Sequence, residues 1–286
     1  MKLASYDDGS RDGQLVVVSR DGGSAHYAGG LATRLQQALD DWGFVSPQLE
    51  DLSQALNHGQ ARHAFAFDAA RCLAPLPRAF RWARPCGGDT AAPGDAAAAR
   101  WVAGPLHHAA ADALRGAHGD VPLPEGAPAD GWTCTAGVAM LTGDIARGAA
   151  PGTALDGVRL LVAWCALAHA DAALDAAAPA AAFAPLAVTP DELGAGWRHG
   201  VVALPLVCSV DGRRVAIDAP APRGHGGEWL AALCRGGAVR AGSIVGLAPG
   251  GSFTVRLGDV LEIDLPGVDG FSVFGAIRQR VTGSGA

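Results

Sequence analysis

The sequence predicts an α+β protein that is predominantly β, with a small N-terminal α+β domain before a larger β-roll domain. The first 74 residues alternate in the order strand, strand, helix, helix, whereas short strand patterns dominate after residue 130. Pro75 and Pro77 stand between the two patterns and mark a linker. We therefore predict an N-terminal domain over residues 1–74 and a β-roll domain over residues 75–286.

The N-terminal elements follow from periodicity and from helix end signals. Residues 3–28 contain two alternating stretches around a glycine-containing turn, which is typical of paired strands. Residues 32–44 carry apolar side chains near one face of a helix. A second helix is predicted over residues 46–59, where Ser46 and Pro47 favour its start and Gly59 its end.

The C-terminal part reads as strands that alternate apolar and polar residues, as half-buried antiparallel strands do. The predicted strand segments are residues 135–144, 158–170, 201–217, 242–248 and 252–277. One helix, over residues 226–237, interrupts them and ends at a glycine pair. The segments 87–100 and 117–131 are rich in small residues, Gly and Pro, and are predicted to be loops.

Composition excludes several classes of protein. The net charge of −6, with 17% charged residues and dispersed arginines, argues against nucleic acid as a partner. Lys2 is the only lysine, which argues against lysine-anchored cofactors. The six cysteines form no CxxC pair, and neither a signal peptide pattern nor an apolar run of about 20 residues is present. We expect a cytoplasmic protein with no membrane partner.

Several segments in order resemble the fumarylacetoacetate hydrolase family, in its subgroup with a distinct N-terminal domain. They are MKLASYDDGSRDGQLVVVS at the start, CLAPLPRAFRWA, AVTPDELG, VRAGSIVG, and RLGDVLEIDLPGVDGFSVFGAI near the end. Together they span well over half of the chain. The resemblance implies a mixed β-sandwich roll, usually a homodimer, that acts on β-dicarbonyl or acylpyruvate substrates through a divalent metal held by three carboxylates.

This chain departs from the family at all three of those positions. The two glutamates, spaced i and i+2, correspond to Thr135 and Gly137, and the third carboxylate corresponds to Ala166. Neither alanine nor glycine has a side-chain oxygen, and a threonine hydroxyl is a poor substitute for the anionic oxygen that a hard cation requires. We therefore predict no metal site and no cofactor.

Other family roles are vacated as well. The family's arginine and lysine correspond to Ala170 and Ala178, and the substrate loop reads Leu247, Ala248, Pro249 and Gly250 without its threonine. The lid segment corresponds to residues 87–100, which contain no histidine. Metal and acid–base groups contribute several kcal/mol and roughly 10²- to 10⁴-fold in rate, so their loss abolishes the family's usual mechanism.

Histidines are the strongest remaining candidates for chemistry. His107 and His108 replace the Met and Tyr of the family's pocket segment, and Asp112 follows within about a turn. Imidazole exchanges protons near neutral pH, so we predict that His107 or His108 is an acid–base group oriented by Asp112. The alternative is that both histidines lie on a surface loop and have no catalytic role.

We predict that Trp132, Thr135, Gly137, Trp164, Cys165, Ala166 and Pro249 line the pocket. The tryptophans are expected to border the space that the lost ligands leave, although core packing is an alternative for each. Cys165 with His169 could form a nucleophile pair only if the strand bends, since i and i+4 lie about 13 Å apart. Cys134 should point to the opposite face from Thr135, into the core.

Two functions remain open from the sequence. The first is a metal-independent enzyme that acts on a small carbonyl-containing intermediate of specialised metabolism by hydration, dehydration, cyclisation or carbon–carbon cleavage. The second is a non-catalytic descendant that binds a small molecule or a partner subunit, favoured by the replacement of so many polar residues by Ala, Gly and Pro. The resemblance implies a homodimer in either case.

Overall fold

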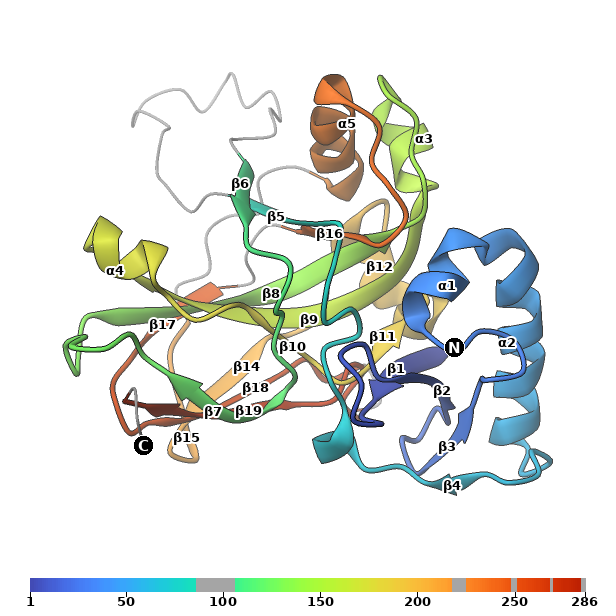
Figure 1. Ribbon diagram of the computed structural model, residues 1–286, viewed down its shortest axis with the longest axis horizontal. Helices are drawn as coiled ribbons and strands as arrows, with labels where there is room; N and C mark the ends of the chain where they lie inside the picture. The colour runs from blue at the N-terminus through green and yellow to red at the C-terminus, as the bar shows by residue number, and fades with distance from the viewer. Residues whose placement is uncertain (86–105, 218–224, 248–250, 268–269, 284–286) are drawn as a thin grey trace.

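The computed structural model describes residues 1–85, 106–217, 225–247, 251–267 and 270–283. Figure 1 shows a strand-rich molecule in which an N-terminal unit of strands and helices, in blue, lies beside a β-roll. The observed class is mixed α+β with β predominant, as the sequence predicts. The described strands form one large sheet, a second sheet packed against part of it, and a two-stranded ribbon.

The large sheet contains 12 strands among the described residues and runs through the whole molecule in the order β4, β3, β2, β1, β11, β9, β8, β16, β5, β6. Two short strands pair beside this path, β10 with β9 and β17 with β8. The bounds are β1 (Lys2–Tyr6), β2 (Gln14–Val18), β3 (Ser24–Tyr27), β4 (Phe65–Ala66), β5 (Arg81–Pro85), β6 (Leu106–Ala109), β8 (Trp132–Thr142), β9 (Val158–His169), β10 (Ala182–Phe183), β11 (Ala187–Val188), β16 (Ser243–Gly246) and β17 (Gly251–Val255).

The second sheet has five strands, in the order β15, β14, β18, β19, β7. The strands are β7 (His118–Pro122), β14 (Val207–Val210), β15 (Arg213–Arg214), β18 (Val260–Asp264) and β19 (Ile277–Thr282), and the separate ribbon pairs β12 (Trp197–Arg198) with β13 (Val201–Val202). Alternation is clearest in β19, where Ile277, Gln279 and Val281 are buried and the residues between them are exposed.

The antiparallel pair β8 and β9 is the backbone of the roll. Eleven residue pairs connect the strands, from Trp132 opposite His169 to Thr142 opposite Val158, with one register shift near Leu141. Both strands are apolar on both faces over most of their length, which fits strands that are covered on two sides. The three positions at which the family resemblance implies metal ligands, Thr135, Gly137 and Ala166, therefore lie on this long strand pair.

The N-terminal unit is joined to the roll by hydrogen bonds between strands. In β1, Lys2 pairs with Val188 and Leu3 with Ala187, so the N-terminal strands continue the same sheet as β9. The two domains predicted on either side of residue 74 thus share one sheet. Tyr6 of this unit packs with Phe65 and Phe67 and closes the N-terminal side of the core.

The three predicted helices are found, and the described residues contain two further short α-helices that the sequence did not predict. The helices are α1 (Leu35–Asp40), α2 (Trp42–Asn57), α3 (Pro151–Leu155), α4 (Ala172–Ala176) and α5 (Gly226–Gly236), with short 3₁₀ segments η1 (Ala69–Arg71) and η2 (Pro190–Gly196). Helix α2 begins four residues before the predicted Ser46, with Pro47 inside it. Val45, Leu49 and Leu56 bury one face of α2, and this packing outweighs the hydrogen bond that Pro47 cannot donate. None of the helices in the described ranges is long and apolar enough to cross a bilayer.

Helices α3 and α5 pack against each other at one end of the roll, through glycines that allow close approach (Figure 1). A β-carbon at Gly227 would overlap the backbone carbonyl of Pro151, whereas a β-carbon at Gly236, in the same helix, would meet nothing within 4 Å. The absence of a side chain at Gly227 therefore sets the distance between the two helices.

The Gly227→Ala variant should lose about 1–3 kcal/mol of unfolding free energy, because the added methyl group forces α3 and α5 apart. Gly236→Ala is the matched control and should be neutral or slightly stabilising, since alanine favours helix. Urea denaturation of both variants measures the difference. Equal stability of the two variants would contradict the close packing.

Candidate functional site

The register of β8 and β9 brings the former ligand positions together. Thr135 lies directly opposite Ala166, and Gly137 lies directly opposite Trp164. Residues opposite each other in a sheet point to the same side, and side chains alternate along a strand, so these four residues share one face. On the other side of β8, Ser252 of β17 lies opposite Thr135 and adds a hydroxyl. Thr135 and Ser252 are half-buried, while Gly137 and Trp164 are buried.

Aromatic side chains enclose one end of this face. The ring of Trp164 contacts Trp82 of β5 edge to face, with centroids 5.1 Å apart, and Trp82 contacts Phe183 of β10 at 5.2 Å. Three strand spacings separate β5 from β9 along the sheet, about 14 Å if the sheet were flat, so contact between their side chains requires the sheet to curl. We call the side that carries Thr135, Gly137, Trp164 and Ala166 the concave face.

The donors on the concave face do not fit a divalent metal. Thr135 and Ser252 offer neutral hydroxyls, and Gly137 and Ala166 offer no side-chain oxygen. Magnesium and manganese prefer carboxylates and water in near-octahedral geometry. Over the ranges that the structure describes, no group of three or more His, Cys, Asp or Glu side chains is placed to hold a metal ion.

Two predicted pocket residues lie on the opposite face, and the prediction for them is corrected. Trp132 is fully buried, donates its indole N–H to the carbonyl of Pro128 at 3.0 Å, and packs against His169. Cys165 lies opposite Ala136, and its thiol contacts the side chain of Gln279 on β19, between the two sheets. Both residues are one position out of phase with Thr135 and Trp164, and this alternation places them in the core.

The structure gives no support for a Cys165 nucleophile. The Nδ1 atom of His169 accepts a hydrogen bond from the backbone N–H of Asp171 at 3.0 Å, so it is not directed at the thiol. The hydrogen bond between Cys134 and Cys165, and then burial, raise the pKa of the Cys134 thiol, as expected for a core position. Burial raises the pKa of Cys208 to about 12. The thiols of Cys134 and Cys208 are therefore unreactive core groups.

His107 and His108 lie side by side on β6 but point to opposite sides of the sheet. His107 pairs with Arg84 and therefore shares the concave face with Trp82, two residues before Arg84, whereas His108 pairs with Ala83 on the outer face. Both histidines are exposed, as is Asp112. Within the described residues, Asp112 makes no hydrogen bond or ion pair with either histidine, so the predicted orienting contact is not present.

Sequence reasoning missed Arg84, Trp82 and Phe183, which the structure adds to the concave face. No local signal identifies them, because their position depends on the pairing of β5 with β16 and β6 and on the curl of the sheet. The remaining predicted pocket residue, Pro249, lies outside the described residues.

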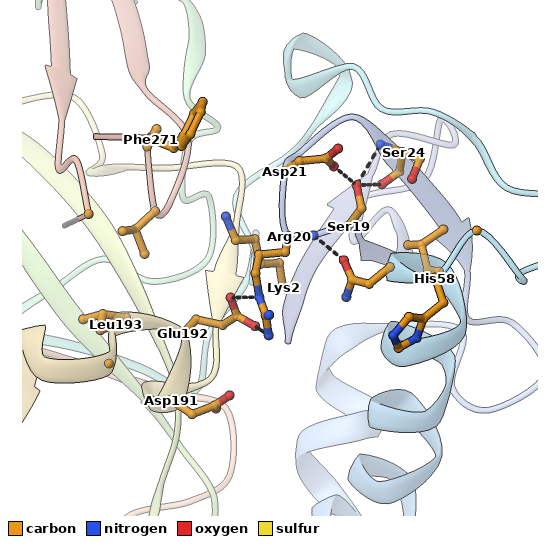
Figure 2. A pocket seen from close by; sticks show the side chains of 17 residues that line it. Lys2, Ser19, Arg20, Asp21, Ser24, His58, Asp191, Glu192, Leu193 and Phe271 are labelled. Atoms are coloured by element: carbon orange, nitrogen blue, oxygen red, sulfur yellow. Dashed lines mark hydrogen bonds and ion pairs between the residues drawn. The ribbon is translucent and has the colours of Figure 1, made fainter. Parts of the chain in front are cut away.

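A cavity lies elsewhere, between the N-terminal unit and the roll, as Figure 2 shows. It measures about 960 Å³ and is lined by residues 2, 19–21, 24, 56–59, 191–194, 267 and 271–273. None of the predicted site residues lines it. Its charges of both signs lie beside one another, and Arg20 approaches Glu192 at 3.4 Å in the centre of Figure 2. This balance gives no preference for a ligand of either charge.

Glu192 is the buried acid of this cavity, with only 5% of its side chain exposed. Burial by itself raises the pKa of Glu192, but the Met1 amino group at 3.0 Å and the Arg20 guanidinium outweigh burial and lower the pKa below its ordinary value. The carboxylate therefore helps to hold η2 against β1 and the β2–β3 turn.

Comparison with protein families identifies the N-terminal unit. Residues 1–78 match the family described as Fumarylacetoacetase N-terminal domain 2. This match covers the whole N-terminal unit and the start of the linker, and it ends three residues before β5. Among curated proteins, none matches the sequence.

Solved structures extend the fumarylacetoacetase-type similarity to the whole fold. Maleylpyruvate hydrolase from Sphingobium sp. SYK-6 matches with a TM-score of 0.70 at 14% identity, over 99% of this chain and 100% of that chain. Fumarylacetoacetate hydrolase from Exiguobacterium antarcticum matches with a TM-score of 0.66 at 15% identity, over 99% of each chain. 2-Hydroxyhepta-2,4-diene-1,7-dioate isomerase from Mycobacterium marinum matches with a TM-score of 0.64 at 13% identity, over the full length of both chains. At such identities the similarity establishes the fold.

The Glu192→Gln variant should be less stable than the wild type at pH 7, because the amide cannot pair with the cations around it. A carboxylate whose pKa is lowered on folding stabilises the protein above its unfolded pKa and loses that contribution as pH falls. The stability difference should therefore shrink as pH drops below the ordinary value of 4.5. Urea denaturation between pH 7 and pH 3 tests this, with the exposed Asp191→Asn as the control; a pH-independent difference would contradict it.

Proposed function

We propose that this chain is a metal-independent member of the fumarylacetoacetate hydrolase family that acts on a small carbonyl-containing compound at the concave face. The full-length fold and the N-terminal family match support the lineage. The observation that carries metal independence is the facing of Thr135 and Ala166, with Gly137 beside them, where carboxylates are expected.

His107 is the proposed acid–base group, because of the two adjacent histidines only His107 shares the concave face. Hydration, dehydration, cyclisation and carbon–carbon cleavage next to a carbonyl all need a proton to be removed or delivered. One positioned imidazole performs either step near neutral pH. The hydroxyls of Thr135 and Ser252 are placed on the same face to donate hydrogen bonds to a substrate oxygen.

The concave face favours a compound of specialised metabolism that carries less charge than an acylpyruvate. Trp82, Trp164 and Phe183 are fully buried and close one end of the face, and the central positions Thr135, Gly137 and Ala166 carry no charge. We further propose that the protein acts in the cytoplasm as a homodimer, as the family resemblance implies.

The alternative function is a non-catalytic protein of the same fold that binds a ligand or a partner subunit. One observation favours it: His107 has no orienting hydrogen bond within the described residues, and catalytic imidazoles usually have one. Turnover and binding experiments distinguish the two functions.

Metal independence predicts that the wild type binds neither Mg²⁺ nor Mn²⁺ with a Kd below about 1 mM, because the concave face lacks carboxylates. Electron paramagnetic resonance of Mn²⁺, titrated with protein, measures the free metal directly. The Thr135→Ala variant is the control. One equivalent of bound Mn²⁺ in the wild type that disappears in Thr135→Ala would refute metal independence.

Catalysis by His107 predicts that His107→Ala lowers turnover by about 10²- to 10⁴-fold, the usual contribution of an acid–base group. The matched control His108→Ala, one residue along but on the outer face, should stay within about threefold of the wild type, as surface substitutions usually do. The assay incubates EDTA-treated protein with β-dicarbonyl and α,β-unsaturated carbonyl compounds and detects products by mass spectrometry. Binding of panel members without any product would favour the non-catalytic alternative.

A further inference from the structure

Arg84 places a positive charge on the concave face. It lies two residues after Trp82 on β5, and Trp82 reaches across to Trp164 and Phe183. Side chains two apart on a strand point to the same side, so Arg84 is directed to the concave face. His107, directly opposite Arg84 on β6, adds a group that can become positive.

Among the described residues, no side chain pairs with this charge. Neither Arg84 nor His107 makes a hydrogen bond or ion pair within the part of the chain that the structure describes. Several other arginines do pair with acids, among them Arg34 with Asp8, Arg78 with Asp12 and Arg278 with Glu262. The cross-strand neighbours at the centre of the concave face, Thr135, Ser252 and Ala166, are uncharged.

Arg84 is also half-buried, so its guanidinium is less hydrated than one that extends freely into solvent. A guanidinium stays protonated throughout the physiological range and presents a planar set of N–H donors that matches a carboxylate with two parallel hydrogen bonds. A half-buried arginine that has no partner among the described residues therefore favours a planar anionic group as its partner.

We propose that Arg84 is the anion-binding residue of the concave face and that it selects a flat, singly charged organic anion with a carboxylate or enolate group. The inference rests on the proposed use of this face as the site. It adds a charged residue to a face on which Thr135, Gly137 and Ala166 of β8 and β9 are uncharged. His107, opposite Arg84, then lies beside the bound anion, at the position that an acid–base group requires.

Benzoate and benzamide test the proposal, because they are nearly the same size and shape and differ in charge. Isothermal titration of the wild type should show benzoate binding at least about tenfold more tightly than benzamide, the factor that one charge-assisted hydrogen bond provides. Arg84→Gln should lower benzoate affinity by at least the same factor and leave benzamide unchanged. Arg84→Lys keeps the charge without the paired donors and should fall between the two.

Arg81→Gln is the matched control, since Arg81 lies on the same strand but points to the outer face and should not affect benzoate. Three results would each overturn the proposal. They are equal binding of benzoate and benzamide, no detectable binding of benzoate at about 10 mM, and unchanged benzoate binding in Arg84→Gln. Loss of turnover in His107→Ala together with unchanged anion binding in Arg84→Gln would overturn only the role of Arg84. Binding that depends on Arg84, without turnover of any compound, would support the anion site and contradict the proposed catalytic function.

Discussion

The pairing of β8 with β9 is the constraint on which the rest of the structure depends. Because these strands are hydrogen-bonded over eleven residue pairs, each side chain on them is committed to one of two faces. One face meets the second sheet through Cys134, Cys165 and Gln279, and the other curls to form the concave face. A slip of one residue would exchange the core for the site, so the apolar residues that fix the register also fix the positions available for chemistry.

Much of the fold could be predicted from the sequence because it depends on local patterns. The alternation in residues 252–277 and the glycine pair that ends α5 are local signals, and the structure confirms β17, β18, the start of β19 and α5 there. The start of α2 was wrong because the prediction gave Pro47 more weight than the tertiary packing of Val45 and Leu49. The joining of the N-terminal strands to β9 could not be predicted, because strand order in a sheet is not a local property.

The site was predictable only in part, and the limit is the same. Thr135 and Gly137 are two residues apart on one strand, so they share a face, and the observed register places Ala166 on the same face. The same alternation, applied to Trp132 and Cys165, would have excluded both from that face. Separation of His107 from His108 required the pairing of β6 with β5, and so did the discovery of Arg84. Residues on one strand could be sorted by phase alone, whereas residues on different strands required the tertiary structure.

Electrostatics accounts for the absence of a carboxylate from all three positions at which the family resemblance implies one, residues 135, 137 and 166. A carboxylate at any one of residues 135, 137 or 166 would be held near the others on a partly buried face, with no cation to offset its desolvation or repulsion. Removing one ligand of a metal cage weakens metal binding, and each remaining carboxylate then destabilises the fold. Small and neutral residues at all three positions relieve that cost together. With uncharged residues at all three positions, this face offers Arg84 no carboxylate among the described residues, and the proposed anion site rests on that balance of charge.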